Sequence, residues 1–270
     1  MSEIPQIGMI QDHFLLGDKE SNVNKIDHWI SHYKNRYPHL SIVMAPELSL
    51  NGYSLIHNYR NEAETAEGPG FEAIAAIAAK HNLYIIYGFA EKENSSMEHI
   101  FNSVNLISPS GKRVDTYRKI QLTKEEKRLF NSGSTLSVVE TEVGIIGIMI
   151  CWDLAFPEIS LELAKNHASL FLAPSAWEMP YNHSFHQFAA ARSLDHTVFT
   201  AASNHIGENT PLHFFGESAI YRPDGSLHSQ GPEDYPAFVQ AEIDYEYLNY
   251  CESHFYSMNV ERLTFLKTSR

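Results

Sequence analysis

Three reactive side chains follow short apolar stretches of this sequence. Glu47 follows an apolar run that ends in Ala-Pro, Lys119 follows an extended segment, and Cys151 ends the most apolar run of the chain. In α/β proteins, functional residues gather where strands end and loops begin. Taken singly, each has an ordinary explanation: such a Glu is commonly a solvated cap, such a Lys a surface charge, and such a Cys a small buried hydrophobe.

Together, the three side chains fit one kind of chemistry. A thiol is nucleophilic only as the thiolate, so Cys151 needs a base or a cation nearby. A carboxylate desolvated at a strand end, such as Glu47, has a raised proton affinity and can serve as that base. The ammonium of Lys119 can stabilise both a thiolate and a developing oxyanion, and the backbone N–H of Trp152 is a second candidate oxyanion donor.

Helices and apolar strands alternate along the chain and would position these groups. Apolar residues at helical spacing predict helices at 23–37, 71–81, about 158–166 and about 185–194. Apolar β-rich runs predict strands at 6–10, 41–45, 83–89, 145–150, 169–173 and 197–202. Continuous apolar strands between helices indicate sheets covered on both faces.

Other segments are typical of hairpins. The runs 104–107 and 113–117 flank a Ser-Pro-Ser-Gly turn, and 219–222 precede Pro-Asp-Gly. Parallel and antiparallel elements together predict a mixed-sheet α/β architecture. Since no repeat, linker or low-complexity segment interrupts the pattern, we expect a single domain over 1–270.

The composition excludes some functions. The 270 residues carry 20 Lys plus Arg against 33 Asp plus Glu, a formal net charge of −13. Without a basic run, this charge would repel phosphate backbones, so no nucleic-acid partner is expected. A chain of this length buries roughly three quarters of the surface that its unfolded form exposes, so it needs no disulfide or metal to hold it together.

The cysteines and apolar segments predict a cytoplasmic protein without a membrane partner. The two cysteines form no disulfide framework, and Cys251, in a polar, aromatic tail, is expected to be an ordinary free thiol. The N-terminal segment lacks both a basic start and a continuous apolar stretch, so we expect no signal peptide. The longest strongly apolar run, 145–152, is too short to cross a bilayer.

The segments APELSLNGY, YRKIQL and GIMICWDLAFPE resemble the Glu, Lys and Cys signatures of the nitrilase superfamily, the carbon–nitrogen hydrolases. The resemblance covers nearly the whole chain, except that the tail 245–270 matches poorly and Gln121 stands where relatives frequently carry His. It implies an α-β-β-α sandwich with mixed sheets. It also implies a triad in which Glu47 is the general base, Lys119 the oxyanion-stabilising cation and Cys151 the nucleophile.

The resemblance suggests further site residues. The family often has a second Glu after the lysine, and counting back four residues from Phe130 selects Glu126, although a slightly shorter loop keeps Glu125 open. Tyr53, in the first signature, and Trp177 are candidates for the acyl pocket. For Trp177, packing in the core or at the rim is equally consistent with the sequence.

The function implied is a cofactor-free and metal-free amidase that hydrolyses a small amide to a carboxylic acid and ammonia through a cysteine thioester. Hydrolysis of an N-carbamoyl compound is the alternative, and nitrile hydrolysis is a weaker one. A binding or regulatory protein that keeps only the fold is a rival from another class, and the intact Glu, Lys and Cys disfavour it. Relatives commonly assemble, so we expect a homodimer or a larger homo-oligomer.

Histidine pairs offer two other interpretations. His28 and His32 lie four residues apart on a predicted helix, and His183 and His186 lie three apart, spacings that could present metal ligands. Among 15 His, such pairs are expected by chance, and no carboxylate completes a site. A Cys–His pair at Cys151 would leave the conspicuous Glu and Lys without a role.

Overall fold

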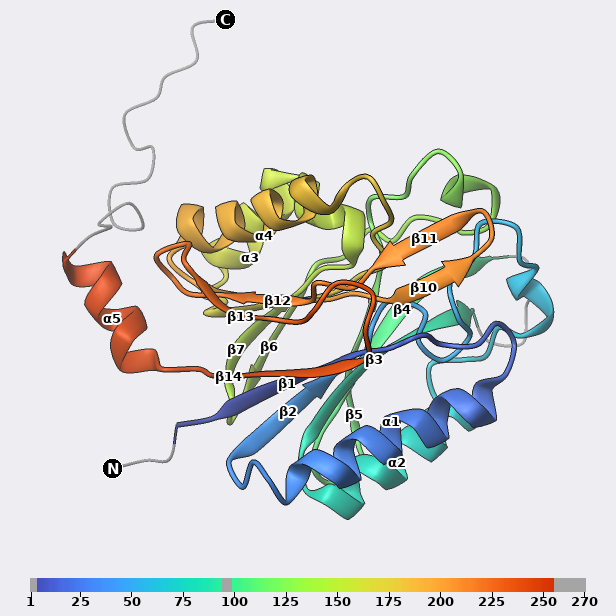
Figure 1. Ribbon diagram of the computed structural model, residues 1–270, viewed down its shortest axis with the longest axis horizontal. Helices are drawn as coiled ribbons and strands as arrows, with labels where there is room; N and C mark the ends of the chain where they lie inside the picture. The colour runs from blue at the N-terminus through green and yellow to red at the C-terminus, as the bar shows by residue number, and fades with distance from the viewer. Residues whose placement is uncertain (1–3, 94–98, 255–270) are drawn as a thin grey trace, which may run out of the picture.

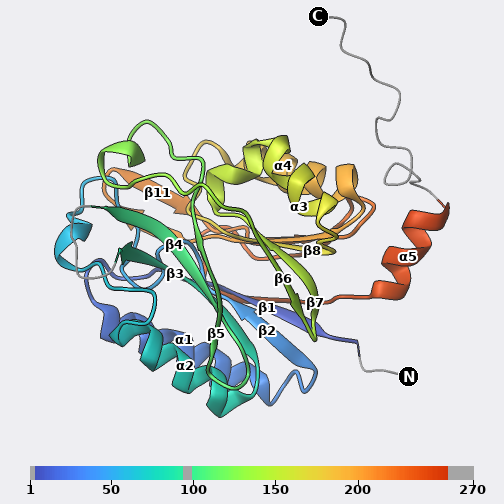
Figure 2. The same cartoon turned by 180° about the vertical axis from the view of Figure 1, so that it is seen from behind.

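In the computed structural model, which describes residues 4–93 and 99–254, two six-stranded sheets pack face to face between helices. Figure 1 shows α1 (Lys19–Lys34) and α2 (Pro69–His81) on the outer face of one sheet. The outer face of the other sheet carries α3 (Pro157–Lys165) and α4 (Asn182–His196), and Figure 2 shows the same layers from behind. The fold is the α-β-β-α sandwich with mixed sheets that the sequence predicts.

Three neighbouring strands of each sheet are parallel and the others are antiparallel. The first sheet has the order β14-β1-β2-β3-β4-β5, with β1, β2 and β3 parallel. The second has the order β13-β12-β9-β8-β7-β6, with β7, β8 and β9 parallel.

The first sheet consists of β1 (Gln6–Gln11), β2 (Leu40–Met44), β3 (Tyr84–Lys92), β4 (Ile100–Ile107), β5 (Arg113–Arg118) and β14 (Ala237–Glu242). The second consists of β6 (Ser137–Thr141), β7 (Gly144–Ile148), β8 (Leu170–Pro174), β9 (Phe199–Ser203), β12 (Ala219–Tyr221) and β13 (Leu227–Gln230). The remaining elements are the hairpin of β10 (Ile206–Asn209) and β11 (Leu212–Phe215), and the helix α5 (Tyr245–His254).

The strand β2 shows why its sequence is continuously apolar. Ile42 and Met44 belong to the core between the two sheets, whereas Val43 and the following Ala45 belong to the core under α1 and α2. Successive side chains of a strand point to opposite faces, so a strand covered on both faces has no polar side. The chain therefore leaves the buried sheet only after Ala45, immediately before Glu47.

The structure extends several predicted elements. The first helix begins at Lys19, not at residue 23, because Asp18 caps it by accepting a hydrogen bond from the Ser21 N–H. The strand β4 begins at Ile100, four residues before the predicted start. The strand β7 ends at Ile148, two residues before the predicted end, so Cys151 lies in the turn after the strand and not directly at its end.

The sequence missed the short and half-exposed elements β6, β10, β11, β13, β14 and α5. β13 is exposed or half-buried at every position, so it carries no apolar run from which a strand could be predicted. Of the poorly matching tail, 245–254 forms α5 and 255–270 lie outside the described residues. No helix within the described ranges has the length and apolar character needed to cross a membrane.

Gly88, in β3, allows the segment after β2 to lie close to the sheet. A Cβ at Gly88 would meet the Leu48 nitrogen at 2.2 Å and the Glu47 carbonyl carbon at 2.9 Å. The Gly88 carbonyl accepts the Leu50 N–H at 2.9 Å, and the Gly88 N–H donates to Ser49 Oγ at 3.2 Å. This close approach fixes the backbone from which Glu47 projects.

We expect Gly88→Ala to lower the free energy of unfolding by about 1–3 kcal/mol, because the atoms that its Cβ would meet are backbone atoms that cannot rotate away. Urea unfolding measures this loss. Gly147→Ala, in β7, is the matched control, since the three atoms nearest to its Cβ would be side-chain atoms, none nearer than 3.1 Å. An equal or larger loss for the control would contradict the importance of the close approach.

Candidate active site

The structure brings Glu47 and Lys119 into direct contact and places Cys151 beside them. Glu47 lies just after β2 and Lys119 directly after β5, both from the first sheet, whereas Cys151 follows β7 of the second sheet. Lys119 Nζ donates a hydrogen bond to Glu47 Oε1 at 2.7 Å, and both side chains are fully buried. Cys151 is 6% exposed. The predicted residues therefore meet across the interface between the sheets.

Of the two candidates for the second carboxylate, Glu126 reaches the lysine and Glu125 does not. Glu126 is buried in the short 3-10 helix η2 (Glu126–Arg128), and Lys119 Nζ donates to its Oε1 at 2.7 Å. Glu125 is exposed and lines the cavity described below. We refer to Glu47, Lys119 and Glu126 as the Lys119 cluster.

Glu126 is held as an anion. Besides Lys119, its Oε1 accepts the Tyr53 hydroxyl at 3.0 Å, and its Oε2 accepts the Thr123 N–H at 2.9 Å. Burial opposes its charge, but the charge of Lys119 and these hydrogen bonds outweigh burial and keep the pKa of Glu126 below its usual value.

The pKa of Glu47 is shifted in the opposite direction from the pKa of Glu126. Burial raises the pKa of Glu47 to about 7, against the charge of Lys119 and reinforced by the charge of Glu126. Its Oε1 is held by Lys119, whereas its Oε2 is buried without a hydrogen-bond partner among the described residues. A carboxyl group with a pKa near neutrality and one unengaged oxygen can accept a proton and return it.

Lys119 remains a cation in this environment. Burial works against its charge, but Glu126 and Glu47 outweigh burial and hold the pKa of Lys119 well above its usual value.

Asn102, which the sequence analysis missed, also holds Glu47. Its side-chain amide donates to Glu47 Oε1 at 2.6 Å, and its backbone carbonyl accepts the Lys119 N–H at 2.8 Å. Asn102 is fully buried in β4, where side chains on both faces are covered. A polar residue within a buried strand was the available signal, because such a group must find a hydrogen-bond partner.

Cys151 opens the short 3-10 helix η3 (Cys151–Ala155) with a backbone φ of +48°. A positive φ is unusual for a residue with a side chain and marks a tight turn at which the chain leaves the sheet. Burial, reinforced by the charge of Glu47, raises the pKa of Cys151 well above its usual value, although Lys119 and the Ala176 N–H oppose the rise. The resting side chain is therefore a thiol.

Asp153, also missed by the sequence analysis, links the Cys151 turn to the Lys119 segment. One carboxylate oxygen accepts the Ile150 N–H at 2.9 Å and the Tyr117 hydroxyl at 2.8 Å, and the other accepts the Gln121 N–H at 2.8 Å. Burial raises the pKa of Asp153 to about 6. Asp153 thereby connects Tyr117 and Gln121, which lie on either side of Lys119, to the turn that contains Ile150 and Cys151.

The predicted pocket residues Tyr53, Trp152 and Trp177 line a cavity of about 520 Å³ that reaches Cys151. The ring centroids of Trp152 and Trp177 are 5.5 Å apart, and both rings pack against Phe188. The other lining residues are Leu55, Leu122, Thr123, Lys124, Glu125, Ala176, Glu178, Tyr181, Ser184 and Leu212. A larger cavity of about 760 Å³, beside α1 and α2, contains none of the predicted site residues.

A further histidine supports the backbone of the site. His205 Nε2 lies 2.6 Å from the Glu47 carbonyl oxygen, and burial lowers the pKa of His205 to about 4. The ring is therefore neutral and its Nε2–H donates to that carbonyl, so His205 fixes the backbone of Glu47.

Three of the four histidines that suggested metal sites, His28, His32 and His186, have other contacts. The rings of His28 and His32 stack on α1, and His186 contacts the Tyr221 hydroxyl and the Glu217 carboxylate. Within 4–93 and 99–254, no group of three or more His, Cys, Asp or Glu side chains is arranged to hold a metal ion.

The chain is similar to known proteins in sequence and in fold. The sequence matches the carbon-nitrogen hydrolase family over residues 6–251. It is 32% identical over 247 residues to "Probable nitrilase C965.09" of Schizosaccharomyces pombe, with 91% of each chain covered. It is 27% identical over 244 residues to a 2-oxoglutaramate amidase of Bacillus subtilis, covering 88% of this chain and 90% of the relative.

The fold is similar to that of Saccharomyces cerevisiae Nit3, described as a member of branch 10 of the nitrilase superfamily. The TM-score is 0.87 at 21% sequence identity, with 98% of this chain and 96% of that chain covered.

The raised pKa of Glu47 predicts a pH-dependent stability. A carboxyl group whose pKa rises from 4.5 to about 7 on folding stabilises the fold fully below pH 4.5, and this contribution is lost as the pH rises through 7. The free energy of unfolding of the wild type should therefore fall, relative to that of Glu47→Gln, by about 1–3 kcal/mol between about pH 5 and about pH 8. Urea unfolding at several pH values measures this difference.

Glu126→Gln is the matched control for this pH dependence. Because the pKa of Glu126 lies below its usual value, its carboxylate stays ionised through that pH range in the folded and the unfolded chain. The difference between wild type and Glu126→Gln should therefore change with pH only because loss of the Glu126 charge lowers the pKa of Glu47, and its slope should be shallower than that for Glu47→Gln. An equally steep slope for this variant would show that the titrating group is not Glu47.

Proposed function

We propose that this chain, which belongs to the carbon–nitrogen hydrolase family, is an amidase that hydrolyses a small linear amide to a carboxylic acid and ammonia. One observation carries the proposal. The buried Glu47 carboxyl is fixed through one oxygen by Lys119 and Asn102, its other oxygen has no hydrogen-bond partner among the described residues, and its charge acts on the Cys151 thiol by raising the pKa of that thiol. This is the arrangement that a thiol nucleophile needs, since it must lose its proton before it attacks.

In the proposed acylation step, Glu47 takes the proton of Cys151 and the sulfur attacks the amide carbonyl carbon. The carbonyl oxygen becomes an oxyanion, which Lys119 and the backbone N–H of Trp152 stabilise. Lys119 donates two of its three protons to Glu47 and Glu126 within the described residues, which leaves the third for the oxyanion. Trp152 lies in the first turn of η3, where an N–H has no acceptor within the helix.

The same carboxyl group then acts as an acid and again as a base. Protonated Glu47 transfers its proton to the departing nitrogen, ammonia leaves, and the acyl group remains as a thioester on Cys151. Glu47 next takes a proton from water, which attacks the thioester and releases the carboxylic acid, and the proton returns to the sulfur. The sum is amide plus water giving acid plus ammonia.

In this proposal, Glu126 positions Lys119 and keeps it charged. Its own anionic state depends on Tyr53 and Thr123, so these residues act on Lys119 through Glu126. When the proton moves from Cys151 to Glu47, the negative charge moves from the carboxylate to the sulfur. The net charge of the buried side chains of Glu47, Lys119, Glu126 and Cys151 does not change. Such a transfer avoids placing an additional ion in the protein interior.

We also propose that the enzyme is cytoplasmic and forms a homo-oligomer. Both cysteines are free thiols, and Cys251 is buried in α5, which fits the reducing cytoplasm. The resemblance to assembling relatives supports a homodimer or a larger homo-oligomer.

The nucleophile can be identified by alkylation. We expect iodoacetamide to modify Cys151 much faster than Cys251 and to abolish turnover, because only Cys151 lies on the cavity beside a base. Mass spectrometry of the modified peptides measures both rates. Glu47→Gln should slow the modification of Cys151, whereas Cys251→Ala should leave activity intact. Equal, slow modification of both thiols would instead support a non-catalytic member of the family.

Ammonia release from matched compounds tests the substrate class. We expect a short aliphatic amide to have a larger kcat/KM than its nitrile, because the amide route needs one proton at the leaving nitrogen and one carboxyl group supplies it. A nitrile must first form a thioimidate, which has to be protonated and hydrated. A faster nitrile would indicate nitrilase activity, and ammonia from N-carbamoyl compounds alone would indicate a carbamoyl hydrolase.

A further inference from the structure

The charged residues that line the cavity are Lys124, Glu125 and Glu178, and they differ in how far solvent reaches them. Lys124 and Glu125 are exposed neighbours of opposite sign, so solvent screens them and their fields largely cancel. Glu178 is half-buried, and this burial raises the pKa of its carboxyl group. No ion pair with Glu178 forms among the residues that the structure describes. A partly desolvated carboxylate thus lines the cavity without an ion-pair partner among the described residues, although the charge of Lys119 acts on it from a distance.

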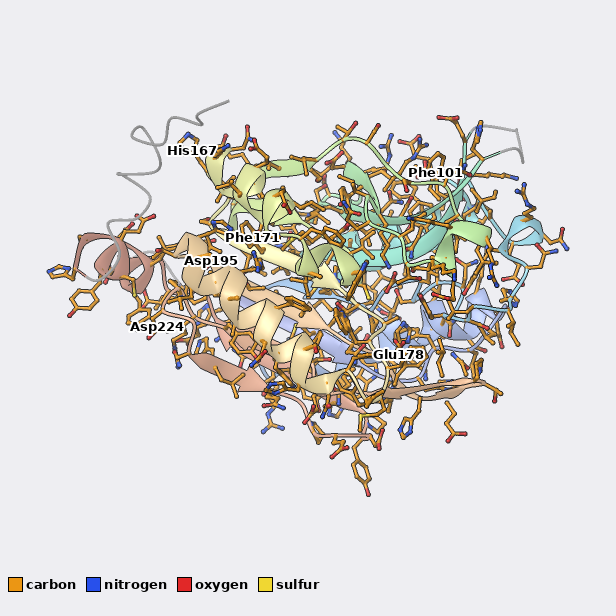
Figure 3. All side chains as sticks on the ribbon, turned by 90° about the horizontal axis from the view of Figure 1, so that it is seen from above. Phe101, His167, Phe171, Glu178, Asp195 and Asp224 are labelled. Carbon is orange, nitrogen blue, oxygen red and sulfur yellow. The ribbon has the colours of Figure 1, made fainter. Side chains whose placement is uncertain are left out.

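Glu178 lies close to the reacting sulfur. It follows Ala176 by two residues, and the Ala176 N–H hydrogen-bonds to Cys151. The Cα atoms of Ala176 and Glu178 are therefore at most about 7 Å apart, a span that about four to six methylene groups cover. Figure 3 shows Glu178 near the N-terminal end of α4, and its backbone pairs with Phe214 of β11.

Aromatic residues line the same cavity as Glu178. Trp177 immediately precedes Glu178, and its ring lies 5.5 Å from that of Trp152 and 6.0 Å from that of Phe188. Tyr181, which is 52% exposed, also lines the cavity. The faces of aromatic rings attract cations, and a carboxylate beside them completes a site for an organic cation.

We propose that the amide substrate carries a positively charged group, an ammonium or an amidinium, at the end remote from its amide, and that Glu178 binds this group. The inference rests on the proposed amidase function and names the substrate class of that same cavity. A substrate with a remote carboxylate would face Glu178, and among the described residues that line the cavity the exposed Lys124 is the only cation that it would meet. The net charge of −13 also favours the approach of a cation.

Binding to the Cys151→Ala protein tests the inference independently of turnover. Calorimetry compares 5-aminopentanamide with hexanamide, in which a methyl group replaces the ammonium, and with the monoamide of adipic acid, which carries a carboxylate. We expect the cationic amide to bind at least about tenfold more tightly than hexanamide. Adding Glu178→Gln should remove this advantage and leave hexanamide binding nearly unchanged. Glu72→Gln, an exposed residue of α2, is the control for the change in net charge.

Tighter binding of the carboxylate or the neutral amide would overturn the inference, and so would a cation preference that survives Glu178→Gln. Turnover of the same three amides by the otherwise native enzyme separates the two proposals. Ammonia from hexanamide without any preference for the cationic tail would leave the amidase function standing and refute the role of Glu178. Selective binding of the cationic amide without ammonia from any of the three would refute the amidase function and support the role of Glu178.

Discussion

The buried ammonium of Lys119 between two carboxylates is the interaction on which the site depends. Transfer of an ion from water into a protein interior costs several kcal/mol, and direct hydrogen bonds of 2.7 Å to Glu47 and Glu126 offset this cost. The two carboxylates differ in what else holds them. Tyr53 and Thr123 stabilise the charge of Glu126, so Glu47 is the one whose pKa burial raises to about 7. Two residues of one chemical type thereby acquire different protonation behaviour.

The surrounding fold maintains this cluster through polar groups placed at the ends of buried strands. Asn102 contacts Glu47 with its side chain and the Lys119 segment with its backbone. Asp153 binds both the Lys119 segment and the turn at Cys151, whose positive φ persists only where surrounding contacts enforce it. Packing of the sheets supplies stability, and these few hydrogen bonds set the relative positions of the reactive atoms.

The sequence predicted the parallel strands and the reactive residues better than their supports. Apolar runs identified β2 and β8 because strands covered on both faces cannot be polar, whereas the half-exposed β13 has no such pattern. The spacing typical of the resembled family favoured Glu126 and left Glu125 open, and the structure brings Glu126 to Lys119. Asn102 and Asp153 were missed because their bonds to Glu47 and to Gln121 span 55 and 32 residues, and a polar residue in a buried segment indicates that it needs a partner but not which distant residue that partner is.

The division of the site between the two sheets has a consequence for the order in which the protein acquires reactivity. The carboxylates, the lysine and Asn102 all precede residue 127, whereas the sulfur is at position 151 on the other sheet. A ribosome delivers the N-terminal part first, so the base and the cation are made before the thiol. In the proposed mechanism, Cys151 gains its base only when the second sheet packs on the first, and until then it behaves as an ordinary cysteine. On that proposal, packing of the two sheets activates the thiol, and a misfolded or unfinished chain does not carry an activated nucleophile.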